Sequence, residues 1–182
     1  MLKAENTCLL VIDLQERLMP AINGNEDLLK RCSALIKGMK LLEVPILVTQ
    51  QYTKGLGPTV PQIAEALGDF EPIEKVTFSC LAEKKFRQEL HDLDKDYVVV
   101  IGAEAHICVQ QTVLDLLDKE HHNVYLIADC VGSRHDTDKE LAIRRIESYG
   151  AVVTSLESVL FELLYTAEHP RRKEIQALVM DL

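Results

Sequence analysis

YVVVIGAEAHICVQQTVLDLL, residues 97–117, passes from an apolar run of strand length to a helical pattern across one short turn. The run at 97–101 is rich in Val and Ile without strict alternation, which is typical of a strand buried on both faces of a parallel sheet. From about 107 to 119, apolar residues recur at helical spacing. The stretch predicts a strand and the helix that crosses over from it.

The same alternation of strand and helix patterns continues on both sides of this stretch. Further strand-length runs lie at residues 8–12, 45–49, 124–128 and 151–154, and helical patterns lie at about 26–42 and 138–148. Parallel strands joined by helices require right-handed crossovers. We therefore expect an α/β fold with a doubly wound, mainly parallel, Rossmann-like sheet and helices on both faces, in a single domain over residues 1–182.

Two segments depart from this alternation. Residues 50–72 contain several Gly and Pro residues and predict a long loop with a short helix near 62–66. Long loops in compact domains are often binding loops. The tail, residues 155–182, predicts two helices, the second beginning near Pro170 because Pro is favoured in a first helical turn.

Charge and length exclude several classes of partner. The chain has 182 residues and a formal net charge of −9. Contacts to nucleic-acid phosphates need clustered Lys and Arg, so we expect no nucleic-acid partner. No run approaches the roughly 18 apolar residues of a spanning helix, so we expect no membrane partner. The N-terminus lacks the long apolar region of a secretory signal, which favours a cytoplasmic protein.

Five cysteines form no CxxC pair and no zinc-type spacing. Their odd number, without a secretory signal, favours reduced thiols, and most should be buried apolar residues. Cys108 is different because it opens a helical stretch, where the helix dipole lowers the pKa of a thiol and favours the thiolate. On that feature alone, a buried structural cysteine is still the commoner interpretation.

Asp13 and Cys108 are the two ionisable residues that lie where sites form in open α/β sheets, beyond the carboxyl ends of strands. Asp13 ends the run CLLVID. It either caps the following turn or acts as a base for a nucleophile. Lys75 follows the long loop in a short extended segment. A lone Lys is usually a surface residue, but beside a thiolate and a carboxylate it would hold the charges together and stabilise an oxyanion.

Several segments together resemble the isochorismatase-like cysteine hydrolases over essentially the whole chain, in particular their small isochorismatase-domain-containing members. These segments are VIDLQERL at 11–18, EKVTFSC at 74–80, VVVIGAEAHICVQQTVLDLL at 98–117, VYLIADCVGSR at 124–134 and GAVVTS at 150–155. The resemblance implies an isochorismatase-like version of the doubly wound fold.

The resemblance also implies a catalytic triad. Asp13 matches the general base, Lys75 the lysine and Cys108 the nucleophile. A non-proline cis peptide is implied between Ala103 and Glu104. It would turn the Glu104 N–H toward the site, beside the Cys108 N–H, as an oxyanion hole. The implied activity is hydrolysis of a small amide or a related C–N acyl compound through a Cys108 thioester.

Departures from the family pattern narrow this expectation. Nicotinamidase-type members bind zinc through an Asp-x-His pair after the second strand, where this chain reads QQYT at 50–53. We therefore expect no metal and no cofactor. True isochorismatases generally lack the cysteine, so isochorismate cleavage is disfavoured. Two alternatives are kept. One is a non-catalytic or redox-sensing protein on the same fold, and the other is a nicotinamidase-like or isochorismate-cleaving member.

Contacts to a small-molecule substrate are expected from residues placed near the strand ends, namely Gln15, Gln51, Tyr52 and Phe78. His106 stands before the nucleophile and is expected to be exposed at a helix start. A homo-oligomer is expected because relatives are commonly oligomeric. The tail also carries an apolar stripe, Ile175, Leu178, Val179 and Leu182, which would pack either on the domain or on a partner subunit.

Overall fold

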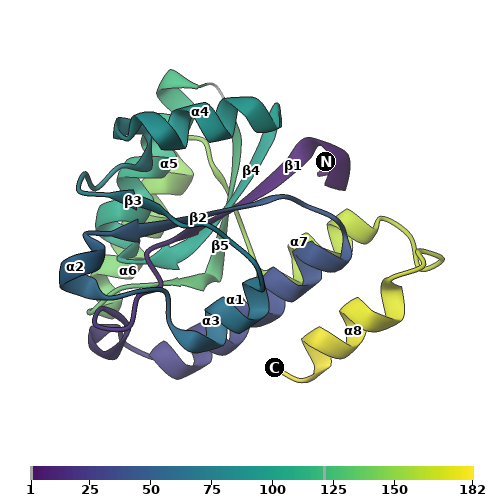
Figure 1. Cartoon of the computed structure of the whole chain (residues 1–182). Helices are drawn as coiled ribbons and strands as arrows, with labels where there is room; N and C mark the ends of the chain where they lie inside the picture. The colour runs from purple at the N-terminus through teal and green to yellow at the C-terminus, as the bar shows by residue number, and fades with distance from the viewer. Residues whose placement is uncertain (1, 121) are drawn as a thin grey trace.

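The computed structural model describes residues 2–120 and 122–182, and its centre is a parallel sheet (Figure 1). Six strands pair in the order β3-β2-β1-β4-β5-β6. Their bounds are Thr7–Ile12 (β1), Ile46–Gln51 (β2), Ile73–Lys75 (β3), Tyr97–Ala103 (β4), Asn123–Gly132 (β5) and Val152–Thr154 (β6). The expected doubly wound parallel sheet is confirmed.

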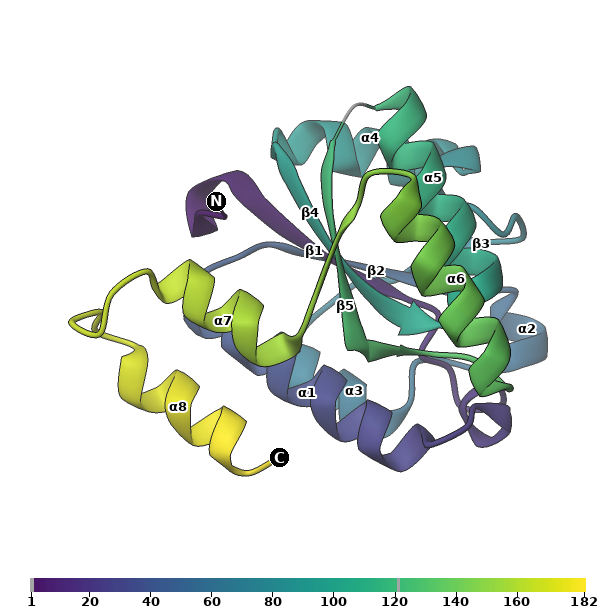
Figure 2. The ribbon, with the colours of Figure 1, turned by 180° about the vertical axis from the view of Figure 1, so that it is seen from behind.

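Helices cover both faces of the sheet (Figures 1 and 2). One face carries α1 (Asn25–Leu41), α3 (Pro61–Leu67), α7 (Leu156–Leu164) and α8 (Arg172–Met180). The other carries α4 (Lys84–Leu93), α5 (Gln110–Lys119) and α6 (Asp136–Ser148). The short α2 (Thr53–Leu56) follows the end of β2. None of these helices is long and apolar enough to cross a membrane.

Each central strand contributes to two cores. In β1, Leu9 and Val11 join the core under α1, while Leu10 and Ile12 join the core on the opposite face. All four side chains are fully buried. Burial on both faces explains why the strand patterns lack alternation.

Two elements had no clear signal in the sequence. The edge strand β3 has only three residues, too few to show a periodicity, and the sequence indicated it only as the short extended segment around Lys75. The helix α4 is largely polar, and only Phe86 and Leu90 are buried, four positions apart on one face. The loop expected at 50–72 contains α2 as well as the expected short helix, which is α3.

The apolar stripe of the tail packs on this chain's own core. Ile175 is fully buried, and Leu178, Val179 and Leu182 pack against the core under α1. The stripe therefore does not support association with a second copy.

β1 and β4 lie side by side at the centre, and the chain leaves them in opposite directions, from β1 to β2 and from β4 to β5. Ligands of open α/β sheets bind beyond the carboxyl ends at such a switch point. Gly102 of β4 lies opposite Ile12 with φ +147°, and a Cβ there would be 2.3 Å from the Ile12 carbonyl oxygen. Only glycine allows this close approach, which brings the two strand ends together.

Candidate active site

Asp13 and Lys75 form a buried ion pair at this switch point. Asp13 directly follows β1, and Lys75 is the last residue of β3. The Lys75 Nζ lies 2.7 Å from Asp13 Oδ2, and both side chains are at most 1 % exposed. The Thr49 hydroxyl donates to Asp13 Oδ1 at 2.8 Å. Both oxygens of the carboxylate are therefore held in place.

The Lys75 ammonium is surrounded by acceptors. Besides Asp13, it donates to Gln51 Oε1 at 2.7 Å and faces the carbonyls of Thr77 and Phe78, both at 3.3 Å. Burial is the largest single influence and lowers the pKa of Lys75, but the Asp13 carboxylate together with the nearby Cys80 and Cys108 side chains outweighs it, and the pKa is raised. Lys75 is a fixed cation whose three N–H bonds already have partners.

Cys108 completes the group from a turn after β4. It lies in a π-helical turn, Ala105–Val109, which delays the start of α5 to Gln110. Single π-helical turns within helices often mark functional sites. The thiol is 6 % exposed and interacts with the Asp13 carboxylate. The turn therefore brings a nearly buried thiol to the ion pair.

The expected low-pKa thiolate is wrong for the resting protein. Burial, and next the Asp13 carboxylate, raise the pKa of Cys108 to about 12. Lys75 opposes this shift only in part, since its charge is already paired with Asp13. A helix dipole acts weakly by comparison with these effects. Cys108 therefore rests as a neutral thiol beside a carboxylate able to accept its proton.

The expected cis peptide between Ala103 and Glu104 is also wrong: the described residues contain no cis peptide bond. The chain turns instead through the left-handed backbone of Glu104, at φ 55°. Asp13 and Tyr52 have positive φ as well, 55° and 37°. Strained conformations cluster at functional sites, and these three follow the carboxyl ends of β4, β1 and β2. The oxyanion hole at Glu104 and Cys108 stays a prediction.

Side chains of the nucleophile turn are tied to the loop after β5. Arg134 Nε lies 2.8 Å from Glu104 Oε1. His106, expected to be exposed, is only 22 % exposed, with Nδ1 3.0 Å from the Ser133 hydroxyl and 3.4 Å from Glu104 Oε2. These contacts leave the imidazole only partly exposed, because the loop after β5 lies against the turn.

Two of the predicted substrate-contact residues, Gln15 and Gln51, hydrogen-bond to the backbone and to Lys75 within the site. Gln15 is fully buried. Its amide accepts from the Gln51 N–H at 2.7 Å and donates to the carbonyls of Gln51 and Gly57 at 3.0 and 2.7 Å. Gln51 in turn binds Lys75 and donates to the Val76 carbonyl at 3.0 Å. Direct substrate contact by Gln15 is therefore corrected to a positioning role.

The other two predicted contact residues are open to solvent. Tyr52 is 51 % and Phe78 53 % exposed. The Tyr52 ring lies against Gly55, where a Cβ would be 2.4 Å from the ring. Both side chains extend from the backbone that surrounds Lys75, since Phe78 gives it a carbonyl and the Tyr52 N–H donates to the Lys75 carbonyl at 2.8 Å.

Thr49 and Thr112 belong to the site although sequence patterns did not single them out. Thr49 fixes Asp13, as described above. Thr112 is fully buried and contacts the backbones of both Cys80 and Cys108. A threonine in a strand or helix is unremarkable by pattern, and only its spacing of four residues from Cys108 hinted at a contact.

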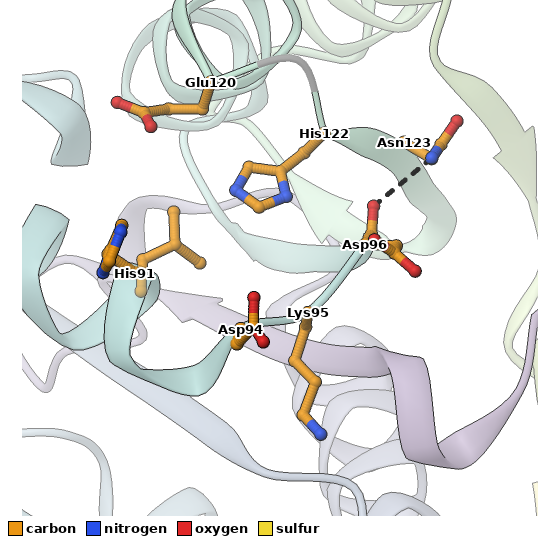
Figure 3. A pocket seen from close by; sticks show the side chains of 8 residues that line it. His91, Asp94, Lys95, Asp96, Glu120, His122 and Asn123 are labelled. Atoms are coloured by element: carbon orange, nitrogen blue, oxygen red, sulfur yellow. Dashed lines mark hydrogen bonds between the residues drawn. The ribbon is translucent and has the colours of Figure 1, made fainter.

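A separate pocket of about 270 Å³ opens at the opposite edge of the sheet, where β4 and β5 begin (Figure 3). Its lining includes His91, Asp94, Lys95, Glu120 and His122. It shares no residue with the group around Cys108. Within residues 2–120 and 122–182, no three His, Cys, Asp or Glu side chains gather as metal ligands.

The chain is similar to known proteins over most of its length. Residues 7–158 match the Isochorismatase domain model. Isochorismatase domain-containing protein 2 of Danio rerio is 36 % identical over 180 residues, 98 % of this chain and 89 % of the relative. The Xenopus laevis protein of the same name is 34 % identical over 177 residues, 97 % of this chain and 84 % of the relative.

Solved structures agree with these relatives. The MAR1 ribonuclease from Caenorhabditis elegans superposes with a TM-score of 0.92 at 36 % identity, covering 98 % of this chain and 92 % of that one. Escherichia coli YcaC, described as an octameric hydrolase of unknown specificity, has a TM-score of 0.87 at 18 % identity, covering 99 % and 95 %, and shows the fold alone. With its matched domain and relatives that span nearly its full length, the chain belongs to the isochorismatase family, whose members are hydrolases.

Proposed function

We propose that this protein is a cysteine hydrolase that cleaves a small amide, or a related C–N acyl compound, through a thioester on Cys108. One observation carries the proposal: the buried Asp13 carboxylate interacts with both the Lys75 ammonium and the Cys108 thiol. Nucleophilic catalysis by a neutral thiol needs such a base within reach.

The first half of the reaction forms the thioester. Asp13 takes the thiol proton as sulfur attacks the substrate carbonyl. The C–N bond then breaks, and the leaving amine takes the proton from Asp13. Lys75 keeps the carboxylate oriented and offsets its charge. The cycle begins at a thiol, so the raised pKa of Cys108 is compatible with the role.

The second half regenerates the enzyme. Asp13, ionised again, takes a proton from water as the water oxygen attacks the thioester. The acid leaves and Cys108 recovers its proton from Asp13. The oxyanion of each tetrahedral state is proposed to bind the backbone N–H groups of Glu104 and Cys108. Lys75 gives it no direct hydrogen bond, since its N–H groups are occupied.

We assign substrate selection to the solvent-exposed side chains of Tyr52 and Phe78 and to Gln51. The proposed steps use no metal or cofactor, because the end of β2 and the residue after it supply amides and a phenol rather than a carboxylate–imidazole pair. A homo-oligomer is proposed by analogy with the octameric YcaC, and light scattering after size-exclusion chromatography would test it.

Other functions fit the site less well. A redox sensor needs an available thiolate, but the pKa values of Cys108 and Cys80 are raised to about 12 and about 11. Burial is the main cause in each, the Asp13 carboxylate adds to it, and the Lys75 ammonium opposes it. Ribonuclease activity, named for the Caenorhabditis elegans relative, would require phosphate binding, and the net charge of −9 opposes it.

A screen tests the proposal. Small primary amides and carbamoyl compounds, with nicotinamide, isochorismate and an RNA oligonucleotide as separate arms, would be assayed for product release. In parallel, intact mass would show any acyl adduct on the protein. We expect amine release with at least one amide and an acyl adduct on Cys108.

Variants make the screen specific. Cys108→Ala should abolish adduct and turnover, and Asp13→Asn should lower turnover by about 10²-fold or more, the usual range for a general base. Cys130→Ala, which removes a buried thiol on the other face of the sheet, is the matched control. Turnover that persists in Cys108→Ala would contradict the mechanism, and turnover of RNA alone would replace the proposed activity.

A further inference from the structure

Thr112 joins the nucleophile to the backbone that holds Lys75. Its hydroxyl accepts from the Cys80 N–H at 3.0 Å and donates to the Cys108 carbonyl at 2.7 Å. The direction is fixed, because a backbone N–H can only donate and the hydroxyl has one proton to give. All three residues are buried, Thr112 completely.

Cys80 lies two residues after Phe78, whose carbonyl faces the Lys75 ammonium. Lys75 binds Asp13, and Asp13 interacts with the Cys108 thiol. The contacts therefore close a ring that runs from Cys108 through Thr112 and the 78–80 segment to Lys75 and Asp13. Because the ring is closed, a change in one contact also changes the distance between the Cys108 thiol and the Asp13 carboxylate.

A second contact ties the same segment to α5 but does not touch Cys108. The Ser79 hydroxyl donates to Asp115 Oδ2 at 2.6 Å. Asp115 lies one turn after Thr112 on α5 and also pairs with Lys119 at 2.7 Å. The Thr112 and Ser79–Asp115 contacts both hold the 78–80 segment against α5. Only the Thr112 contact includes Cys108.

We infer that Thr112 is a positioning residue. By linking the nucleophile turn to the 78–80 segment, it fixes the Cys108 thiol against Asp13. The nucleophile turn is π-helical, a rare geometry that is frequent at functional sites. Without the hydroxyl, the Cys108 carbonyl and the Cys80 N–H lose their shared partner. The inference rests on the proposed function for its catalytic meaning, but its geometric content stands apart from any substrate.

The test compares Thr112→Val, Thr112→Ser and Asp115→Ala in the full chain. The rate of Cys108 alkylation by iodoacetamide is followed against pH by intact mass and peptide mapping. In Thr112→Val, the thiol gains solvent and separates from Asp13, so the midpoint should fall by about one pH unit or more. Thr112→Ser keeps the hydroxyl and should restore the wild-type profile, and Asp115→Ala should leave it unchanged.

Unfolding would also expose thiols, so the buried Cys8, Cys32 and Cys130 serve as internal reporters and must stay unmodified. Thr112→Val with an unchanged midpoint overturns the inference, as does an equal shift in Asp115→Ala. Where an amide is turned over, Thr112→Val should lower kcat by about tenfold and leave KM nearly unchanged. A wild-type protein that turns over no amide contradicts the proposed function, and the alkylation profiles still decide the role of Thr112.

Discussion

Replacing Lys75 by Met removes the ammonium and keeps a long unbranched side chain in its place. The Asp13 carboxylate is then buried without its counter-charge, as both side chains are at most 1 % exposed. Breaking a buried pair by removing one partner costs about 3–5 kcal/mol. For a chain of this length, each kcal/mol lowers Tm by about 2–4 °C, so the melting temperature should fall by about 6–20 °C.

A surface ion pair with the same nitrogen–oxygen distance provides the control. Lys85 lies 2.7 Å from Glu71, the distance found between Lys75 and Asp13, but its side chain is 49 % exposed and that of Glu71 is 84 % exposed. Solvent screens such a pair, so Lys85→Met should leave Tm nearly unchanged. The comparison isolates burial, because the charge removed and the residue introduced are the same.

Calorimetry or circular dichroism near pH 7.5 measures the effect in full. The folded-state pKa of Lys75 is raised above the ordinary value of 10.5, so its contribution to stability is complete below 10.5 and is lost only as pH rises through the higher folded value. Adding Asp13→Asn to Lys75→Met removes the orphaned charge and should recover much of the loss. Equal Tm changes in the Lys75 and Lys85 variants, or no recovery in the double variant, would refute the role given to burial.

Two further predictions concern the thiol and the strand junction. Because the pKa of Cys108 is raised from 9.0 to about 12, its alkylation near pH 8 should be about 10³-fold slower than that of an ordinary thiol. Folding stability should also fall above pH 9, where only the unfolded thiol ionises. Asp13→Asn should speed alkylation, and a midpoint near 9 in the wild type would contradict this account. Gly102→Ala should destabilise by about 1–3 kcal/mol more than Gly150→Ala, since only the former meets backbone, at 2.3 Å from the Ile12 oxygen. If chemical denaturation showed equal losses of unfolding free energy in the two variants, the clash with the Ile12 backbone would not be the cause of the Gly102→Ala loss.

The amino-acid sequence by itself determined the doubly wound parallel sheet. Apolar runs such as 97–101 carry that information locally, because burial on both faces requires unbroken Val, Ile and Leu. It also placed Asp13 and Cys108 at strand ends, where sites form. The placement of Lys75 in the site rested on the family resemblance, because its strand of three residues has too little pattern to show where its side chain lies.

Only the tertiary structure decided how these groups behave. Lys75 meets Asp13 across 62 positions of the chain, and the pKa of Cys108 depends on burial and on Asp13, neither of which is local to its helix. The sequence pattern favoured a thiolate because the helix dipole is a local effect, whereas desolvation and ion pairing come from distant segments. For the same reason, the roles of Gln15 and Thr112 emerged only once three strands and α5 had brought their hydrogen-bond partners together.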